Sequence, residues 1–159
     1  MTVREYEDGD ICRMREIWNA VVEDGEAFPQ EKTLGVTEAE EFFGAQSVCG
    51  AAAEDGEVVG MYILHPNNVG RCGHICNASY AVDKRYRGQG IGEALVRDSM
   101  ERAKKLGFGI LQFNAVVADN MPARRLYESI GFIQLGTIEG GFRMKNGEYA
   151  DICPYYIKL

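Results

Sequence analysis

The chain has 159 residues, with 17 Lys and Arg against 24 Asp and Glu, so its net charge at pH 7 is −7. The length suits a single domain spanning residues 1–159, and an apolar content of 46% with 26% charged residues excludes a disordered or low-complexity chain. The acidic balance argues against nucleic acid or an anionic membrane as the main partner.

The N-terminus and the cysteines exclude further classes of protein. The chain is charged from Arg4 onward, lacks an apolar targeting segment and has no apolar run as long as a membrane span, so we expect a cytoplasmic protein. Five irregularly spaced cysteines argue against a disulfide framework. Cys72, His74 and Cys76 lie close together, but a fourth ligand and a recognised spacing are missing, so we expect no metal site.

The N-terminal quarter of the chain predicts a strand and two helices. Residues 2–7 are typical of a short strand, and residues 9–24 have apolar side chains spaced by three or four, as in an amphipathic helix. Residues 24–36 contain two glycines and a proline, which predicts a loop. A second helix is expected over residues 37–46, with Thr37 as its N-cap and Glu40 as the capping-box partner.

The remaining elements predict the fold class. The pair Asp55-Gly56 marks a hairpin turn between two strands. The later segments alternate between strand and helix patterns, and together with the hairpin they give strands over 47–55, 57–66, 73–83, 109–117, 133–139 and 148–159, and helices over 91–106 and 119–132. This order predicts an α/β (α+β) fold, in which a mixed, mostly antiparallel sheet of about seven strands has helices on both faces.

A cluster of glycines stands at the junction between the strand 73–83 and the helix 91–106. Gly88, Gly90 and Gly92 follow Arg87 directly, and glycine weakens regular structure unless the backbone there needs it. Free N–H groups at a helix N-terminus bind anions, and missing Cβ atoms let a bulky phosphate approach. The spacing fits neither a P-loop nor a dinucleotide fingerprint. A pyrophosphate site and a tight turn without a ligand remain as alternatives.

Two motifs resemble the GCN5-related N-acetyltransferase (GNAT) family. The stretch "RGQGIG" matches its R-x-x-G-x-G signature, and "NMPARRLYESIGF" matches its second signature at the expected distance. The resemblance implies a GNAT fold, splayed between the fourth and fifth strands, and acetyl-CoA as cofactor with its pyrophosphate on residues 87–92. The cofactor-binding residues that it implies are Val82, Arg87, Gly88, Gln89, Gly90, Ile91, Gly92, Asn120, Arg124 and Tyr127.

The second motif carries the expected catalytic acid. By resemblance, Tyr127 donates a proton to the leaving thiolate of coenzyme A, and a positioned phenol can serve as a general acid. The alternative is a core tyrosine with a satisfied hydroxyl. Asn120 is expected both to cap the helix 119–132 and to contact the cofactor. Arg124 is expected either to reach the cofactor phosphates or to be a solvated surface arginine.

The acceptor side of the site has a narrower resemblance. The stretch "HPNNVGRCGHICNASYAV" is similar to fungal acetyltransferases that detoxify proline analogues such as azetidine-2-carboxylate. That resemblance implies that Asn77 holds a substrate carboxylate and that Asn114 orients the amine or the thioester, as a catalytic as well as a substrate-binding residue. Alternatively, the two amides bond to each other or to strand backbone. Phe28 is expected to wall the acceptor pocket or to anchor its loop.

The strand 73–83 carries no acid between His74 and Val82, so we expect water-mediated deprotonation of the amine instead of a carboxylate base. The resemblance implies an acyl-CoA-dependent N-acyltransferase acting on a small amine, such as an amino acid or a proline-like analogue, and a possible homodimer. The alternatives are a protein N-terminal or lysine acetyltransferase and a non-catalytic acyl-CoA sensor.

Overall fold

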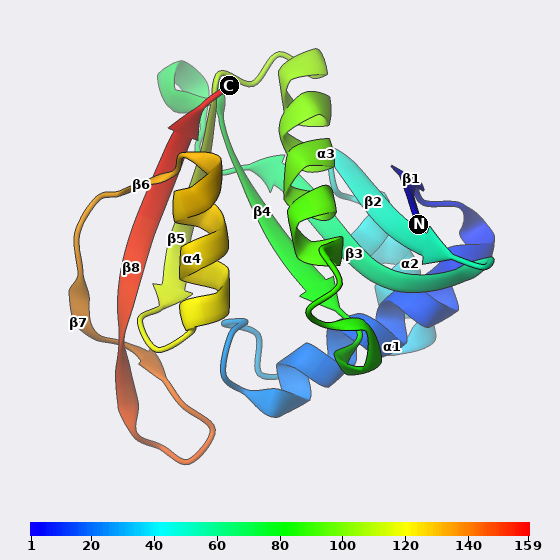
Figure 1. Cartoon of the computed structure of the whole chain (residues 1–159), viewed down its shortest axis with the longest axis horizontal. Coiled ribbons are helices and arrows are strands. Elements are labelled where there is room, and N and C mark those ends of the chain that lie inside the picture. The colour runs from blue at the N-terminus through cyan, green and yellow to red at the C-terminus, as the bar shows by residue number, and fades with distance from the viewer.

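A computed structural model describes residues 1–159 as one sheet flanked by helices (Figure 1). The strands are β1 (Thr2–Glu5), β2 (Val48–Glu54), β3 (Glu57–Pro66), β4 (Ile75–Val82), β5 (Ile110–Val117), β6 (Ile133–Gln134), β7 (Ile138–Arg143) and β8 (Tyr149–Lys158). The helices are α1 (Ile11–Asp24), α2 (Val36–Gly44), α3 (Ile91–Lys105) and α4 (Met121–Ile130). None of these helices is both long and apolar enough to span a membrane.

The sheet has eight strands in the order β1-β2-β3-β4-β5-β8-β6, and β7 also pairs with β8. Every pairing is antiparallel except β4 with β5, which are parallel and paired at only two positions. Beyond those positions the two strands diverge toward their C-terminal ends, as Figure 1 shows. The predicted mixed sheet and its splay between the fourth and fifth strands are therefore confirmed.

The strand expected over residues 133–139 is two strands, β6 and β7, which raises the number from about seven to eight. The break lies opposite Pro154 of β8, which has no N–H to donate to a neighbouring strand. Gly136, between β6 and β7, accepts a hydrogen bond at its carbonyl from the side chain of Gln134 at 3.0 Å. The missing donor thus interrupts the ladder where an uninterrupted strand was expected.

Helices cover both faces of the sheet, as predicted. Helices α1 and α2 bury Met14, Trp18 and Phe43 against one face. Helix α3 buries Leu95 on the other face, and α4 packs beside it. The two faces therefore belong to two separate cores, so side chains that alternate along a central strand enter different environments.

Helix ends follow the expected chemistry at α4 but not at α2. The Asn120 side chain accepts from the Ala123 N–H at 3.4 Å, so the expected cap is confirmed, and α4 ends at Gly131 in the left-handed region. The expected capping box at Thr37 is wrong, because α2 begins at Val36 and its N-cap is Gly35, two residues before Thr37. The carboxylate of Glu38 accepts from the Gly35 N–H at 3.2 Å and so satisfies the first free donor of the helix.

Candidate active site

The glycine turn joins β4 to α3 through backbone that favours glycine. Gly88 and Gly90 have φ angles of 76° and 80°, in the left-handed region. A Cβ added to either would meet no atom within 4 Å, so the space in front of the turn is open. At Gly92 an added Cβ would lie 3.5 Å from a Leu126 methyl, which is an ordinary van der Waals distance, so α4 packs beside the start of α3. Ile91 is buried and anchors the start of α3.

The amide N–H groups of residues 87–93 donate no hydrogen bond within the chain. This run includes Gln89 in the turn and the first residues of α3, whose N-terminus carries the positive end of the helix dipole. Unsatisfied backbone donors at a helix N-terminus form an anion site. The residues present therefore fit the expected diphosphate group.

The cations beside the turn have different partners. Lys84 pairs with Asp24 at 2.7 Å, and Arg85 pairs with Asp83 at 2.9 Å. Arg87 makes no ion pair or side-chain hydrogen bond within the chain. Its guanidinium is therefore available to an anion bound at the turn, where a charge-assisted contact is strong.

The splay between β4 and β5 begins immediately after their two paired positions. The register ends at Cys76 and Leu111, and the Asn77 side chain then donates to the Gln112 carbonyl at 2.8 Å. This bond matches the expected alternative, an amide bonded to strand backbone across the splay. Val82, at the far end of β4, pairs with Gly60 of β3 and leaves its other edge toward the gap.

Tyr127 lies over this gap. Its ring centroid is 4.5 Å from that of Phe113 on β5 and 6.5 Å from that of Tyr80 on β4, so it packs against both diverging strands. Burial raises the pKa of the Tyr127 phenol above its usual value of 10.0. The hydroxyl has no hydrogen-bond partner within the chain, which differs from the satisfied core tyrosine considered as an alternative. A neutral, unengaged phenol is suited to donate a proton.

A cluster of carboxamides lies beyond the gap on β5. Asn114 sits in a bulge where the pairing with β8 shifts, and bulges re-aim side chains. Asn114 donates to Asn67 at 2.7 Å and accepts from it at 3.3 Å, and Gln112 donates to Asn114 at 3.2 Å. The sequence reasoning missed Asn67 and Gln112. The available signal was that Gln112 and Asn114 stand two positions apart on a strand, which places their side chains on the same face of the sheet.

Phe28 anchors its loop, which is one of its two expected roles, and its role as a wall of the acceptor pocket stays a prediction. It is buried and lies 4.4 Å from Trp18, measured between ring centroids, so it anchors the loop after α1. It also lines a cavity of about 770 Å³ between that loop and the hairpin of β7 and β8. Gly25 and Lys145 bring the two segments together, since a Cβ on Gly25 would lie 2.7 Å from the Lys145 Cβ.

The donors of Arg124 are already engaged within the chain. Its guanidinium donates to the Tyr155 hydroxyl at 3.0 Å, to the Ala118 carbonyl at 2.9 Å and to Gln134 Oε1 at 3.2 Å. These contacts tie α4 to β8 and β6, so Arg124 is not the solvated arginine that was considered. Its contact with cofactor phosphates stays a prediction, as does that of the capping residue Asn120.

A family comparison bears directly on these features. Residues 13–132, which include the turn, the splayed strands and Tyr127, match the model of the acetyltransferase (GNAT) family. The chain belongs to the GNAT family of acetyltransferases. The family expectation drawn from "RGQGIG" and the second motif is thereby confirmed.

Two curated relatives resemble part of this GNAT chain. N-acetyltransferase aca1 of Schizosaccharomyces pombe is 36% identical over 99 residues, which are 62% of this chain and 47% of that protein. L-amino acid N-acetyltransferase AaaT of Escherichia coli is 32% identical over 107 residues, which are 67% of this chain and 64% of that protein. The chain thus spans less than two thirds of the length of either relative.

Solved structures share the whole GNAT fold. A GCN5-related N-acetyltransferase from Kribbella flavida is 31% identical, with a TM-score of 0.91 over 99% of this chain and 97% of that one. The yncA protein of Salmonella typhimurium, solved with its cofactor acetyl-CoA, has a TM-score of 0.92 at 20% identity, over 99% and 93% of the two chains. The second likeness supports the fold alone.

Proposed function

We propose that this GNAT chain transfers the acetyl group of acetyl-CoA to the amine of a small molecule, with amino acids and proline-like analogues as the first candidates. The observation that carries the proposal is the run of free N–H groups over residues 87–93, at the mouth of the gap over which Tyr127 lies. The kinship with acetyltransferases, one of them named for L-amino acids, supports it.

On the side of the acetyl donor, backbone amides and one cation bind the coenzyme. The amides of residues 87–93 hold the diphosphate, and Arg87 adds a charged contact. Bound acetyl-CoA supplies an activated thioester with a thiolate leaving group. Tyr127 donates its proton toward that sulfur from the α4 side of the sheet, and its neighbours Phe113 and Tyr80 keep the ring in place.

The acceptor side lies on the opposite face of the sheet. Phe113 belongs to the core under α3 and α4, so its neighbours Gln112 and Asn114 face α1 and α2. By the same alternation Asn77 shares that face, since Cys76 enters the core under α3 and α4. We assign Asn77 to the substrate carboxylate and Asn114 to orientation of the amine. The amine then loses its proton to water, because β4 offers no carboxylate.

The test is an assay of free coenzyme A release over a panel of amines. The panel holds free amino acids, azetidine-2-carboxylate, proline, simple alkylamines and short peptides with free N-termini or lysines. Acetylation of free amino acids or their analogues above the peptides supports the proposal. Preference for peptides points to a protein acetyltransferase. Coenzyme A binding without thiol release from any amine points to an acyl-CoA sensor. Either of these outcomes overturns the small-molecule assignment.

The proposal also covers the partners, the location and the oligomeric state of the enzyme. The net charge of −7 supports a small-molecule substrate over nucleic acid or an anionic membrane. A cytoplasmic location and a homodimer stay predictions from the sequence and the family resemblance. Fractionation of the native host and light scattering of the purified chain would test these two.

A further inference from the structure

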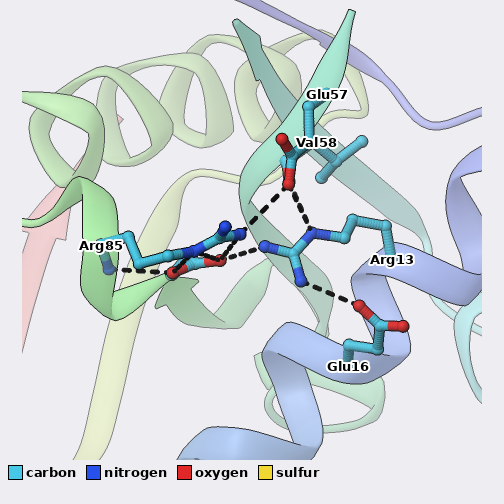
Figure 2. A network of polar contacts seen from close by, with 6 residues as sticks. Arg13, Glu16, Glu57, Val58 and Arg85 are labelled. Atoms are coloured by element: carbon cyan, nitrogen blue, oxygen red, sulfur yellow. Dashed lines mark hydrogen bonds and ion pairs between the residues drawn. The ribbon is translucent and has the colours of Figure 1, made fainter.

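A closed ring of four charged side chains lies beside the entry to the glycine turn. Asp83, at the end of β4, pairs with both Arg13 of α1 and Arg85. Glu57 of β3 lies 3.4 Å from the Arg13 guanidinium and 3.2 Å from that of Arg85, which closes the ring. Figure 2 shows Arg13 and Arg85 approaching Glu57 from two different elements. Two anions and two cations therefore alternate around the ring.

Arg13 is the member that fixes this ring to the body of the protein. Its Nε donates to the Val58 carbonyl at 3.2 Å, and another nitrogen pairs with Glu16 at 2.9 Å on the same helix. The Arg13 side chain is 24% exposed and that of Asp83 is 11% exposed, so the pair is shielded from water. The planar guanidinium holds four partners at once, in a geometry that lysine cannot reproduce.

Asp83 is the member that fixes the turn. Its carboxylate accepts from the Arg85 N–H at 2.9 Å and so caps the short 3-10 helix Lys84–Tyr86. Its own N–H donates to the Val59 carbonyl at 2.9 Å, and its carbonyl accepts from the Tyr86 N–H at 2.9 Å. These hydrogen bonds therefore fix the backbone from Asp83 to Tyr86.

The contrast with the next segment shows what this anchoring does. The amides of residues 87–93 have no internal partner, so only the segments on either side of the turn determine where these donors point. The helix α3 fixes one side, and Asp83 fixes the other. A binding site whose donors are held in place before the ligand arrives loses less entropy on binding.

We propose that Asp83, locked by Arg13, is a positioning residue that sets the affinity of the turn for the diphosphate of the coenzyme. This inference rests on the proposed function of the turn. It gives α1 an influence on coenzyme binding through the ion pair between Arg13 and Asp83.

The test measures coenzyme A binding by calorimetry, together with KM for acetyl-CoA and kcat, in Arg13→Gln, Arg13→Lys and Asp83→Asn. We expect the Kd for coenzyme A and the KM to rise about tenfold in Arg13→Gln and Asp83→Asn, which corresponds to about 1.4 kcal/mol. We expect kcat at saturating acetyl-CoA to change less than about twofold, because the reacting groups are untouched. Arg13→Lys should lie between the wild type and Arg13→Gln.

The matched control is Arg102→Gln. Arg102 pairs with Asp98 at 2.8 Å, and their side chains are 26% and 22% exposed, much like the proposed pair, but they lie in the second half of α3. This control should lower the melting temperature as the test variants do and leave the Kd for coenzyme A unchanged. The double variant of Arg13 and Asp83 should bind no more weakly than either single variant, because both remove one interaction.

Two results would overturn the inference. One is an unchanged Kd for coenzyme A in Arg13→Gln and Asp83→Asn, together with a loss of melting temperature equal to that of the control. The pair would then have a structural role only. The other is full additivity in the double variant. Binding of coenzyme A needs no acceptor amine. A failure to find an acetylated amine would therefore contradict the proposed function, while the measurement of coenzyme A affinity would still test this inference.

Discussion

The ring of Tyr127 packs 4.5 Å from that of Phe113, on the face of the sheet opposite the carboxamides of β5. The proposed proton donor and the proposed acceptor groups thus lie on opposite sides of one gap. For Tyr127→Phe we expect kcat to fall about 100-fold and KM for acetyl-CoA to stay nearly constant, because only the acid is lost. Free coenzyme A release measures both. Tyr149→Phe, at an exposed tyrosine of β8, is the control. An unchanged kcat in Tyr127→Phe would remove the acid assignment.

The raised pKa of Tyr127 predicts the pH profile. Burial keeps the phenol protonated beyond its usual pKa of 10.0, so the acid form persists throughout the working range. We expect kcat of the wild type to show no descending limb between about pH 6 and 10, since loss of this proton lies above that range. A descending limb that disappears in Tyr127→Phe would show a lower pKa than burial predicts.

Gly90→Ala separates backbone strain from coenzyme binding. Gly90 and Gly56 both have positive φ, at 80° and 84°, and an added Cβ meets nothing at either position. Each substitution should cost roughly 1 kcal/mol of stability through the left-handed conformation. Only Gly90→Ala should also weaken coenzyme A binding, by about tenfold or more, because its methyl occupies the approach to the amides. Equal calorimetric affinities in the two variants would contradict the site.

Arg87→Gln tests the one cation of the turn without a partner. We expect the Kd for coenzyme A to rise about tenfold at low salt, and the difference from the wild type to shrink as salt screens the contact. Arg97→Gln is the control, because Arg97 pairs with Glu93 at 2.8 Å on the surface of α3. A salt-independent difference, or an equal effect in the control, would argue against a phosphate contact by Arg87.

The ion pairs of Asp83 predict acid sensitivity. Arg85 first, and then Arg13, hold the pKa of the Asp83 carboxyl well below its ordinary value of 3.8, although burial acts to raise it. Glu57 and Lys84 are the other charged groups beside this carboxyl. A lowered folded pKa contributes stability above the unfolded pKa and loses it as pH falls below that value. The loss of unfolding free energy in Asp83→Asn should therefore be larger at pH 7 than at pH 3. Denaturant titrations at both values check this, and equal losses would contradict it.

The sequence predicted much of the fold, because helix periodicity and the hairpin at Asp55-Gly56 are local signals. It missed the division of β6 from β7, because that break depends on Pro154, a residue of another strand. Of the candidate site, the turn could be predicted from spacing. The Arg13–Asp83 pair spans 70 positions and Asn67–Asn114 spans 47, and nothing local marks either.

The reciprocal bond between Asn67 and Asn114 also bears on selectivity. Each amide satisfies the other when the site holds no acceptor, at 2.7 Å and 3.3 Å, so a guest that parts them must replace both bonds. A zwitterion brings oxygen acceptors and nitrogen donors together and can replace both bonds, whereas an unfunctionalised alkylamine offers no acceptor and leaves the parted carboxamides to water. With Asn114 in its proposed role of orienting the amine, this pairing would favour amino acids over simple alkylamines.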